Sequence, residues 1–244
     1  IQTLRSFCPA FVRAFLLLKE QPMTGFSDYT AKKVLDHIVG KTAMGALPTG
    51  YIALFTAVGA DDGTGFTEVA GGSYARVATA GADWNAAAGS SPSSNSNANA
   101  MTFPKPTADW GTVIALGIYD AATGGNLLMW DYLGNYPWLP ATISAASPGV
   151  ITAKGHGYGA GDKVVYSTEF GGTAPAVSQG NLTGLLDVVS PVADSFTVKS
   201  GATAVNTSGT GSGMVRKVAA QVISSGVVAS FAGGTPGALV LSAA

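Results

Sequence analysis

The sequence predicts a mainly β fold: a jelly-roll-like β-sandwich domain with one short N-terminal helix and an inserted small β-module. Three observations predict it. Short runs rich in β-branched and aromatic residues recur at even spacing, and clusters of Gly, Pro and Asn separate them. Only one segment has apolar residues at helical spacing. The sequence also lacks the alternation of strands and helices that builds a parallel sheet.

The single predicted helix covers residues 27–39. Ser27 can cap its start, and Gly40 follows where a helix commonly ends in the left-handed conformation. His37 lies off the apolar stripe, and we expect it to be exposed. The stripe, at i, i+3, i+4 and i+7, consists of Ala31, Val34, Leu35 and Ile38. The helix therefore has one apolar face to bury.

Strands are predicted after this helix. Residues 89–100, "GSSPSSNSNANA", are polar and of low complexity, which predicts a loop that is mobile or contacts a neighbour. Two prolines restrict residues 101–108 to an edge strand or an extended segment. The turn "ATGGN" between two apolar runs gives the clearest hairpin signal in the chain. The predicted strands are 49–57, 73–80, 110–121 and 127–133.

The residue pattern of the sequence changes at about Pro140. Short apolar runs broken by Gly, Pro and Asn follow, and after Arg216 the chain resembles its first part again. We expect a discontinuous main domain, residues 23–139 plus 217–244, with a small β-barrel or β-repeat module, residues 140–216, inserted into one of its loops. The predicted strands of the module lie within 149–153, 162–167, 185–191 and 194–200.

Residues 1–22 are expected to lie outside the folded domain. Arg13 interrupts their apolar stretch, no small-residue cleavage site follows, and the stretch is too short and too charged to span a bilayer. Lys19 and Glu20 can be encoded by a bacterial ribosome-binding sequence that stands just before Met23. These residues are therefore predicted to be an upstream read-through leader or disordered, and the protein to be made in a bacterial cytoplasm.

Composition argues against several classes of function. Charged residues make up 11% of the chain and the net charge is −1, so no broad field attracts nucleic acid or an anionic membrane. Cys8 is the only cysteine, which excludes an intrachain disulfide and a thiolate metal site. Two histidines argue against a multi-histidine zinc site. So low a fraction of charged residues suits a subunit of a neutral assembly, or equally a β-protein that merely has few charged residues.

Four stretches carry a family resemblance: "FSDYTAKKVLDHIVGKTAMGALPTGYIALFTA", "EVAGGSYARVA", "MTFPKPTADWGTVIALGIYDAATGGNLLMW" and "ISSGVVASFAGGTPGALVLS". Together they cover about 23–139 and 217–244, and they resemble small structural proteins of tailed bacteriophages, of the tail-fibre type. The hairpin segment "GIYDAATGGNLL" is the most specific part. The resemblance implies a component of the virion.

A second pattern lies within residues 141–216. Gly-His-Gly at 155–157 is followed by Gly161-Asp162, by "DSFTV" at 194–198 and by Gly-Ser-Gly at 211–213. This order resembles a β-repeat of phage tail and virion proteins. The stretch "GTAPAVSQGNLTGLLDVVSP" replaces the Leu-Pro and Tyr-rich strand that such a repeat usually has, so the strand pairing expected there stays open.

His156 is predicted to be a turn residue and not a catalytic base. The glycines on either side permit positive φ, and the imidazole can cap local backbone groups. The nearest carboxylate in sequence, Asp162, belongs to a turn of its own. No GxSxG, Walker A, HExxH or CxxC motif occurs in the chain. We therefore expect a protein without enzymatic activity and without a cofactor.

Two acidic residues offer a weak metal site. Asp61 and Asp62, in "GADDGTG", could hold Ca²⁺, which prefers clustered carboxylates. The stretch lacks the spacing of an EF-hand loop and has no distal Glu, so a plain Asp-Gly turn is favoured and no metal is expected.

Four aromatic residues close together in sequence are the candidate contact site: Trp130, Tyr132, Tyr136 and Trp138. Aromatic side chains provide large contact areas at little entropic cost, which suits receptors, sugars and partner subunits. Strand alternation places Trp130 and Tyr132 on one face, where core packing is an equal interpretation. Tyr136 and Trp138 flank Pro137 beyond the strand and are better candidates for exposure.

The sequence thus predicts a non-enzymatic virion structural protein of a tailed phage, a tail-fibre or tail-associated component. Its expected partners are other virion proteins, in the head or the tail, and further copies of itself, with neither nucleic acid nor membrane. Alternatives are a capsid decoration protein and a module that binds host-surface glycan or another receptor. A glycan-degrading enzyme is a further alternative, but no convincing pair of catalytic carboxylates can be assigned.

Overall fold

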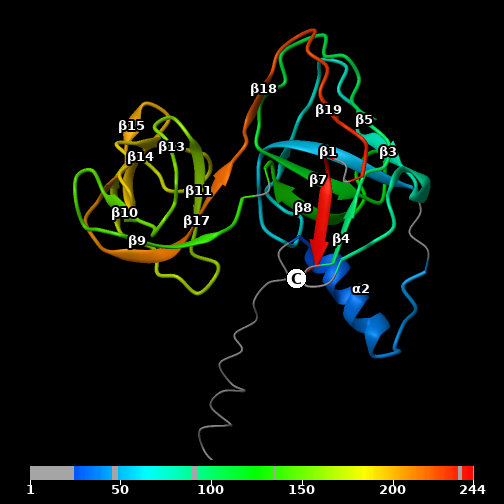
Figure 1. Ribbon diagram of the computed structural model, residues 1–244, viewed down its shortest axis with the longest axis horizontal. Helices are drawn as coiled ribbons and strands as arrows, with labels where there is room; N and C mark the ends of the chain where they lie inside the picture. The colour runs from blue at the N-terminus through cyan, green and yellow to red at the C-terminus, as the bar shows by residue number, and fades with distance from the viewer. Residues whose placement is uncertain (1–24, 46–48, 90–92, 135, 236–237, 244) are drawn as a thin grey trace, which may run out of the picture.

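The structure is a computed structural model that describes residues 25–45, 49–89, 93–134, 136–235 and 238–243. The predicted leader, residues 1–22, lies outside these ranges. Within them the fold is mainly β with one α-helix, as the sequence predicts. Figure 1 shows two lobes. We call residues 25–134 with 219–243 the sheet lobe, and residues 136–218 the barrel lobe.

The barrel lobe is a closed ring of six antiparallel strands. Hydrogen bonding runs in the order β9-β17-β11-β13-β14-β10, and β10 pairs again with β9. Alternate side chains of each strand point inward, so that Leu186, Phe196 and Val215 are almost completely buried. The ring consists of β9 Leu139–Ile143, β10 Val150–Thr152, β11 Lys163–Ser167, β13 Leu186–Val189, β14 Ser195–Ser200 and β17 Gly211–Val218.

Three short strands complete the barrel lobe. β15 (Thr203–Ala204) pairs with β14, and β12 (Val177–Gln179) pairs with β16 (Asn206–Thr207). The pairing of β12 with β16 accounts for part of the stretch whose strand pairing the sequence left open.

The sheet lobe is built on a five-stranded antiparallel sheet. Its order is β2-β1-β7-β8, and β3 also pairs with β1. In the central pair Ile52 lies opposite Ile118, and Leu54 opposite Leu116. The β7–β8 pair is the predicted hairpin. The bounds are β1 Gly50–Ala57, β2 Thr67–Glu68, β3 Val77–Thr79, β7 Ala115–Tyr119 and β8 Leu127–Tyr132.

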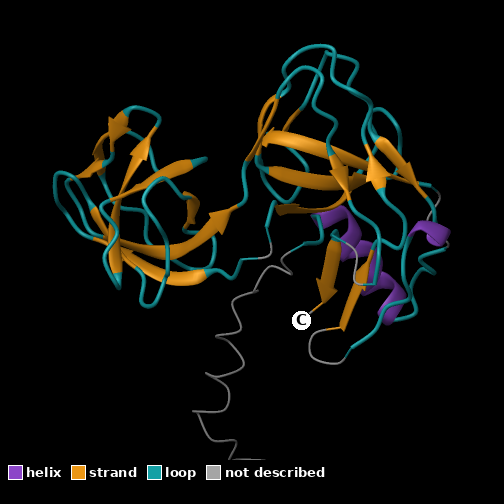
Figure 2. Cartoon of the chain, turned by 45° about the horizontal axis from the view of Figure 1, so that its top comes forward, coloured by secondary structure: helices purple, strands orange, loops and turns teal. Residues whose placement is uncertain are grey.

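Three two-stranded pairs, visible in Figure 2, accompany this sheet in place of a continuous second sheet. Phe103, Trp110 and Ile223 from these pairs and their flanks pack with Ile52 and Leu54 of β1 in one buried core. The pairs are β4 Ser93–Ser96 with β20 Val240–Ala243, β5 Met101–Thr102 with β19 Ser230–Phe231, and β6 Gly111–Val113 with β18 Gln221–Ile223.

The expectation of one strand over 110–121 is wrong. The segment divides at Ile114, whose backbone N–H donates to the Phe55 carbonyl (2.9 Å), so β6 pairs with β18 while β7 pairs with β1. The predicted strand 73–80 likewise shortens to Val77–Thr79, because Ser73 adopts a positive φ of 63° in a turn.

The expectation of a loop over 89–100 is wrong for residues 93–96, because Ser93–Ser96 form β4. Asn97, which follows, is completely buried. Its side-chain amide donates to the carbonyls of Asn99 (2.8 Å) and Ala232 (3.0 Å) and accepts from the N–H of Leu239 (2.8 Å). One side chain thus satisfies backbone groups of the C-terminal segment, which fixes a stretch of low complexity in place.

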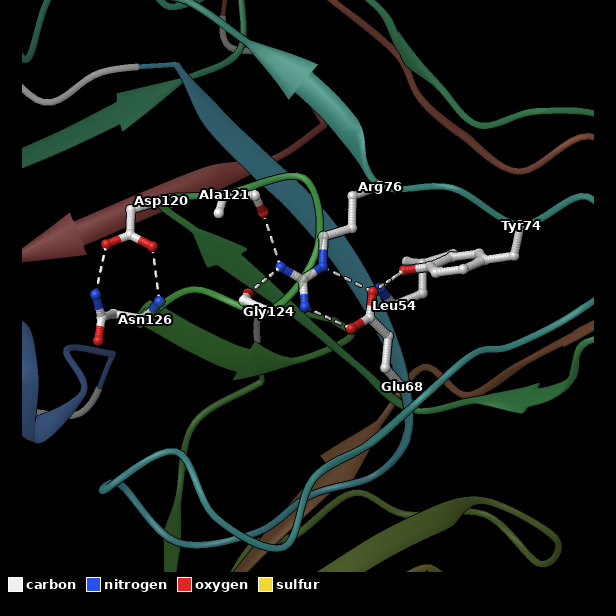
Figure 3. A network of polar contacts seen from close by, with 8 residues as sticks. All are labelled: Leu54, Glu68, Tyr74, Arg76, Asp120, Ala121, Gly124 and Asn126. Atoms are coloured by element: carbon white, nitrogen blue, oxygen red, sulfur yellow. Dashed lines mark hydrogen bonds and ion pairs between the residues drawn. The ribbon is translucent and has the colours of Figure 1, made fainter.

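The hairpin is tied to the neighbouring strands by Arg76 (Figure 3). Its guanidinium, with a side chain 7% exposed, pairs with Glu68 through two hydrogen bonds of 2.7 and 2.9 Å. It also donates to the carbonyls of Ala121 and Gly124 in the hairpin turn, both at 2.8 Å, and lies 3.5 Å from the centroid of the Tyr119 ring. A planar donor fork of this kind holds several partners in one geometry.

The helix, α2 (Asp28–Ile38), has the predicted ends. Ser27 caps its N-terminus, and the hydroxyl also donates to the carbonyl of Leu127. Gly40 follows the C-terminus with a φ of 73°. The predicted burial of the apolar stripe is wrong: no residue of α2 is buried, and Ile38 is 71% exposed. Contacts with β8 hold the helix, Ala31 and Val34 of the stripe are half-buried, and Leu35 and Ile38 nearer its C-terminal end are exposed.

Candidate functional site

Three of the four candidate aromatic residues pack inside the junction between the lobes. Trp130 and Tyr132 occupy alternate positions on β8, with ring centroids 5.4 Å apart. Trp138, just before β9, lies 6.1 Å from Tyr132 and 5.2 Å from Phe170, which follows β11 in the barrel lobe. Phe66 lies against the other end of this row, 5.2 Å from Trp130. The row of rings therefore connects the two lobes by packing and does not form an exposed flat surface for a ligand.

Packing continues around these rings. Val165 and Val218 of the barrel lobe share a buried cluster with Ala53 and Phe55 of β1. Burial raises the pKa of the Tyr132 phenol well above its ordinary range, and the charge of Glu169 raises it further. The phenol is therefore neutral at physiological pH and serves as a packing group.

A polar cross-link lies beside the rings. Arg216 of β17 is 5% exposed and donates to both carboxylate oxygens of Asp131 on β8. It also donates to the carbonyl of Gly134 (3.1 Å). Its guanidinium carbon lies 6.0 Å from the Tyr132 ring centroid and 5.9 Å from that of Trp138. The pair joins a strand of the barrel to a strand of the sheet.

Sequence reasoning did not single out Arg216, Asp131 or Phe170. A signal for Arg216 was present, since it stands between apolar residues in "MVRKV", a segment that the structure places in β17. A buried Arg in such a place usually has a partner. Nothing local identifies Asp131 as that partner, because the two residues meet only through the fold.

The carboxylates of Asp61 and Asp62 accept hydrogen bonds from different partners. The Asp61 carboxylate accepts a hydrogen bond from the indole N–H of Trp130 (2.9 Å), which orients that ring. Asp62 accepts from the backbone N–H and the hydroxyl of Thr64, at 2.9 and 2.7 Å, and these bonds lower the pKa of Asp62. Among the described residues, no group of three or more His, Cys, Asp or Glu side chains is arranged to hold a metal ion.

Tyr136 is the candidate aromatic residue that reaches the surface. It is 39% exposed, and the ammonium of Lys217 lies 5.3 Å from its ring centroid. Beside it is a cavity of about 190 Å³, which Leu139, His156 and Tyr158 help to line. This cavity lies where the chain enters and leaves the barrel lobe, and its lining mixes polar and apolar groups.

His156 follows the turn after β10, as expected of a turn residue. The glycines on either side have φ of 65° and 62°, and the Nδ1 atom accepts a hydrogen bond from the N–H of Tyr158 (2.9 Å). The ring packs against Tyr158 and Phe196, with centroids 4.9 Å from each. The Asp162 carboxylate is engaged elsewhere, by Lys217 and by the N–H of Gly159, both at 2.8 Å. His37 is exposed, as predicted.

Residues 25–137 match a family of phage fibre proteins. The family is described as podophage GP4 fiber I protein gp80. No curated protein matches the chain.

The matched range starts beside α2 and ends just before β9. It therefore includes the five-stranded sheet and leaves out the barrel lobe and the C-terminal strands, so it covers slightly less than half of the chain. The match supports a structural protein of the phage fibre type. The resemblance of residues 141–216 to the Gly-His-Gly repeat lies outside the match and stays a prediction. No helix in the described ranges has the length and apolarity needed to cross a bilayer.

Proposed function

We propose that the chain is a non-enzymatic structural component of a tailed-phage virion, placed in the fibre or another tail-associated part. The match of residues 25–137 to a podophage fibre family carries this proposal. The low fraction of charged residues supports it, because subunits with few charges pack together without strong repulsion. Its partners are other virion proteins and further copies of the chain, and it is made in the bacterial cytoplasm before assembly.

In this proposal the two lobes have separate roles. The segment 140–216 is an inserted module that projects from the particle, while residues 23–139 and 217–244 form the main domain that packs against neighbours. The row of rings and the Arg216–Asp131 pair support such a division, because a rigid junction presents a projecting module at one angle.

Labelling of purified virions tests this proposal. An antibody against residues 170–180, most of which are exposed, is bound to virions and located by electron microscopy of gold-labelled particles. We expect gold on the tail or its fibres. Gold over the head would instead support a capsid decoration protein. Virions that carry no label and no peptide of this chain by mass spectrometry would overturn the proposal.

A second candidate function is recognition of a host-surface saccharide, which the exposed Tyr136 beside its cavity favours. An aromatic face with polar groups around it suits a neutral sugar ring. Lys217 is already paired with Asp162, so the rim carries little free charge. Trp138 is a poor probe of this function, because it packs between Tyr132 and Phe170.

Adsorption of the purified protein to host cells tests the second function. Tyr136→Ala should reduce adsorption by about tenfold, the equivalent of about 1.4 kcal/mol. Tyr29→Ala is the matched control, since this tyrosine is also partly exposed and has the ammonium of Lys33 4.8 Å from its ring. Equal adsorption of both variants and the parent protein would exclude a receptor role for Tyr136.

A further inference from the structure

The helix α2 has an apolar face that nothing in the described residues covers. Leu35, Ile38 and Val39 are 58%, 71% and 73% exposed. They lie on one side, since residues three and four apart share a helix face. A helix of eleven residues is marginal in water unless an apolar face packs against a partner. A partner that covered this face would stabilise the helix further.

The same lobe carries an uncovered apolar groove of about 420 Å³. It lies along β18 and the segment that leads to β19, and β6 is the only described strand that pairs with β18. Val222, Val227 and Val228 line it and are 69%, 52% and 46% exposed. Leu54, Leu133 and Phe231 also contribute to the wall, and none of the described lining residues is charged.

The two surfaces lie at opposite ends of the sheet lobe. Figure 1 shows α2 at the bottom of this lobe and β18 at the top, and the turned view of Figure 2 keeps them apart. A chain therefore does not place its own helix in its own groove. A second copy can do so, because it brings a free helix to a free groove.

We infer that copies of this chain pack head to tail, with the α2 face of one copy seated in the β18 groove of the next. An amphipathic helix in an apolar groove is a recurrent mode of recognition. Charges do not oppose the contact, because Lys32 pairs with Asp28 and Lys41 with Asp36 along the helix itself, at 3.7 and 3.8 Å. An interface between two different surfaces propagates into a ring or a filament.

This inference deepens the proposed structural role and rests on it, because it names the neighbour against which the sheet lobe packs. Self-association is measured on the purified full chain, whereas the virion role is measured on particles, so the two can fail separately. A chain that is found in virions but stays monomeric would remove the inference and leave the proposed function in place.

Sedimentation equilibrium over a range of concentrations tests the inference. Ile38→Glu removes the helix face and Val222→Glu removes the groove. Both sites are mostly exposed, so neither substitution disturbs the chain's own core. Each variant should weaken association at least tenfold. Val192→Glu is the matched control, because Val192 is 63% exposed in the barrel lobe and belongs to neither surface. It should associate like the parent chain.

Mixing the two variants gives the sharpest result. The Ile38→Glu chain keeps its groove and the Val222→Glu chain keeps its helix face, so an equal mixture should form dimers and nothing larger. Circular dichroism of each variant, matched to the parent chain, establishes that the fold is intact.

Three results would overturn the inference. The first is a parent chain that stays monomeric at every concentration. The second is a mixture of the two variants that stays monomeric although the parent associates. The third is association that survives Ile38→Glu but disappears when residues 1–24 are removed, which would assign the contact to that segment.

Discussion

The barrel lobe and the sheet lobe bury their β cores in different ways. In the barrel every strand of the ring pairs on both sides, and alternate residues such as Phe196 and Val198 point inward. In the sheet lobe β7 is buried along its whole length and three short strand pairs complete the core. No described residue covers the apolar face of α2 or the β18 groove. A closed barrel has no free edge, so it is complete as a monomer. The sheet lobe retains apolar surface that assembly can bury.

The largest effect should separate the two lobes. Phe196→Ala removes a ring from the centre of the barrel and should lower its free energy of unfolding by about 3–5 kcal/mol. Urea unfolding is followed by far-ultraviolet circular dichroism, which reports both lobes, and by tryptophan fluorescence. Three of the four tryptophans, Trp84, Trp110 and Trp130, belong to the sheet lobe and only Trp138 to the barrel lobe, so most of the fluorescence change should keep its midpoint.

The control for this experiment is Val192→Ala, an exposed position of the same lobe, which should change stability by less than about 0.5 kcal/mol. If Phe196→Ala shifted the two transitions equally, the lobes would unfold as one unit and the comparison would fail.

A smaller effect should come from the junction. Asp131→Ala leaves the buried guanidinium of Arg216 without its carboxylate partner and should cost about 1–3 kcal/mol. Asp36→Ala is the matched control, because its partner Lys41 is exposed and such a pair contributes less than about 1 kcal/mol. Urea unfolding measures both. Equal costs would show that the Arg216–Asp131 pair does not stabilise the junction.

The smallest predicted effect is the loss of folding stability at low pH. Burial raises the pKa of Asp120 and of Asp162, but hydrogen bonds from Asn126 and from Lys217, respectively, outweigh it and hold both pKa values below the ordinary range. Because the folded pKa lies below the unfolded value of about 3.9, this stabilisation is present above about pH 4 and is lost as the pH falls through the folded pKa.

Substitution by Asn checks this acid dependence in each lobe. Asp120→Asn should reduce the fall of the urea midpoint below about pH 4 in the fluorescence transition, which reports mainly the sheet lobe. Asp162→Asn should reduce that fall in the circular dichroism transition, to which both lobes contribute, and leave the fluorescence transition unchanged. The measurement is the urea midpoint against pH. Slopes unchanged in both variants would show that other carboxylates set the acid limit.

Local chemistry made part of this structure predictable. The ends of α2 follow from Ser27 and Gly40, and the hairpin follows from its turn residues. Features made by distant contacts were not predictable. The break at Ile114 depends on a hydrogen bond to Phe55, and the order around Asn97 depends on the C-terminal segment.

The candidate site shows the same limit. Alternation placed Trp130 and Tyr132 on one face of a strand, but it could not show what covers that face. Phe66, which is distant in sequence, packs on Trp130, and Trp138, which itself packs on the distant Phe170, covers Tyr132. The exposed stripe of α2 has a similar explanation, because helical spacing predicts an apolar face and cannot say whether the same chain buries it.

Hydrogen exchange of the free chain and of the chain in purified virions tests most directly whether the sheet lobe is the part that assembles. Mass spectrometry of peptides from both samples locates the change. We expect slower exchange in virions at residues 31–39 and 221–231, and unchanged exchange at residues 177–192 of the barrel. Slower exchange confined to the barrel, with residues 31–39 and 221–231 unchanged, would contradict the account.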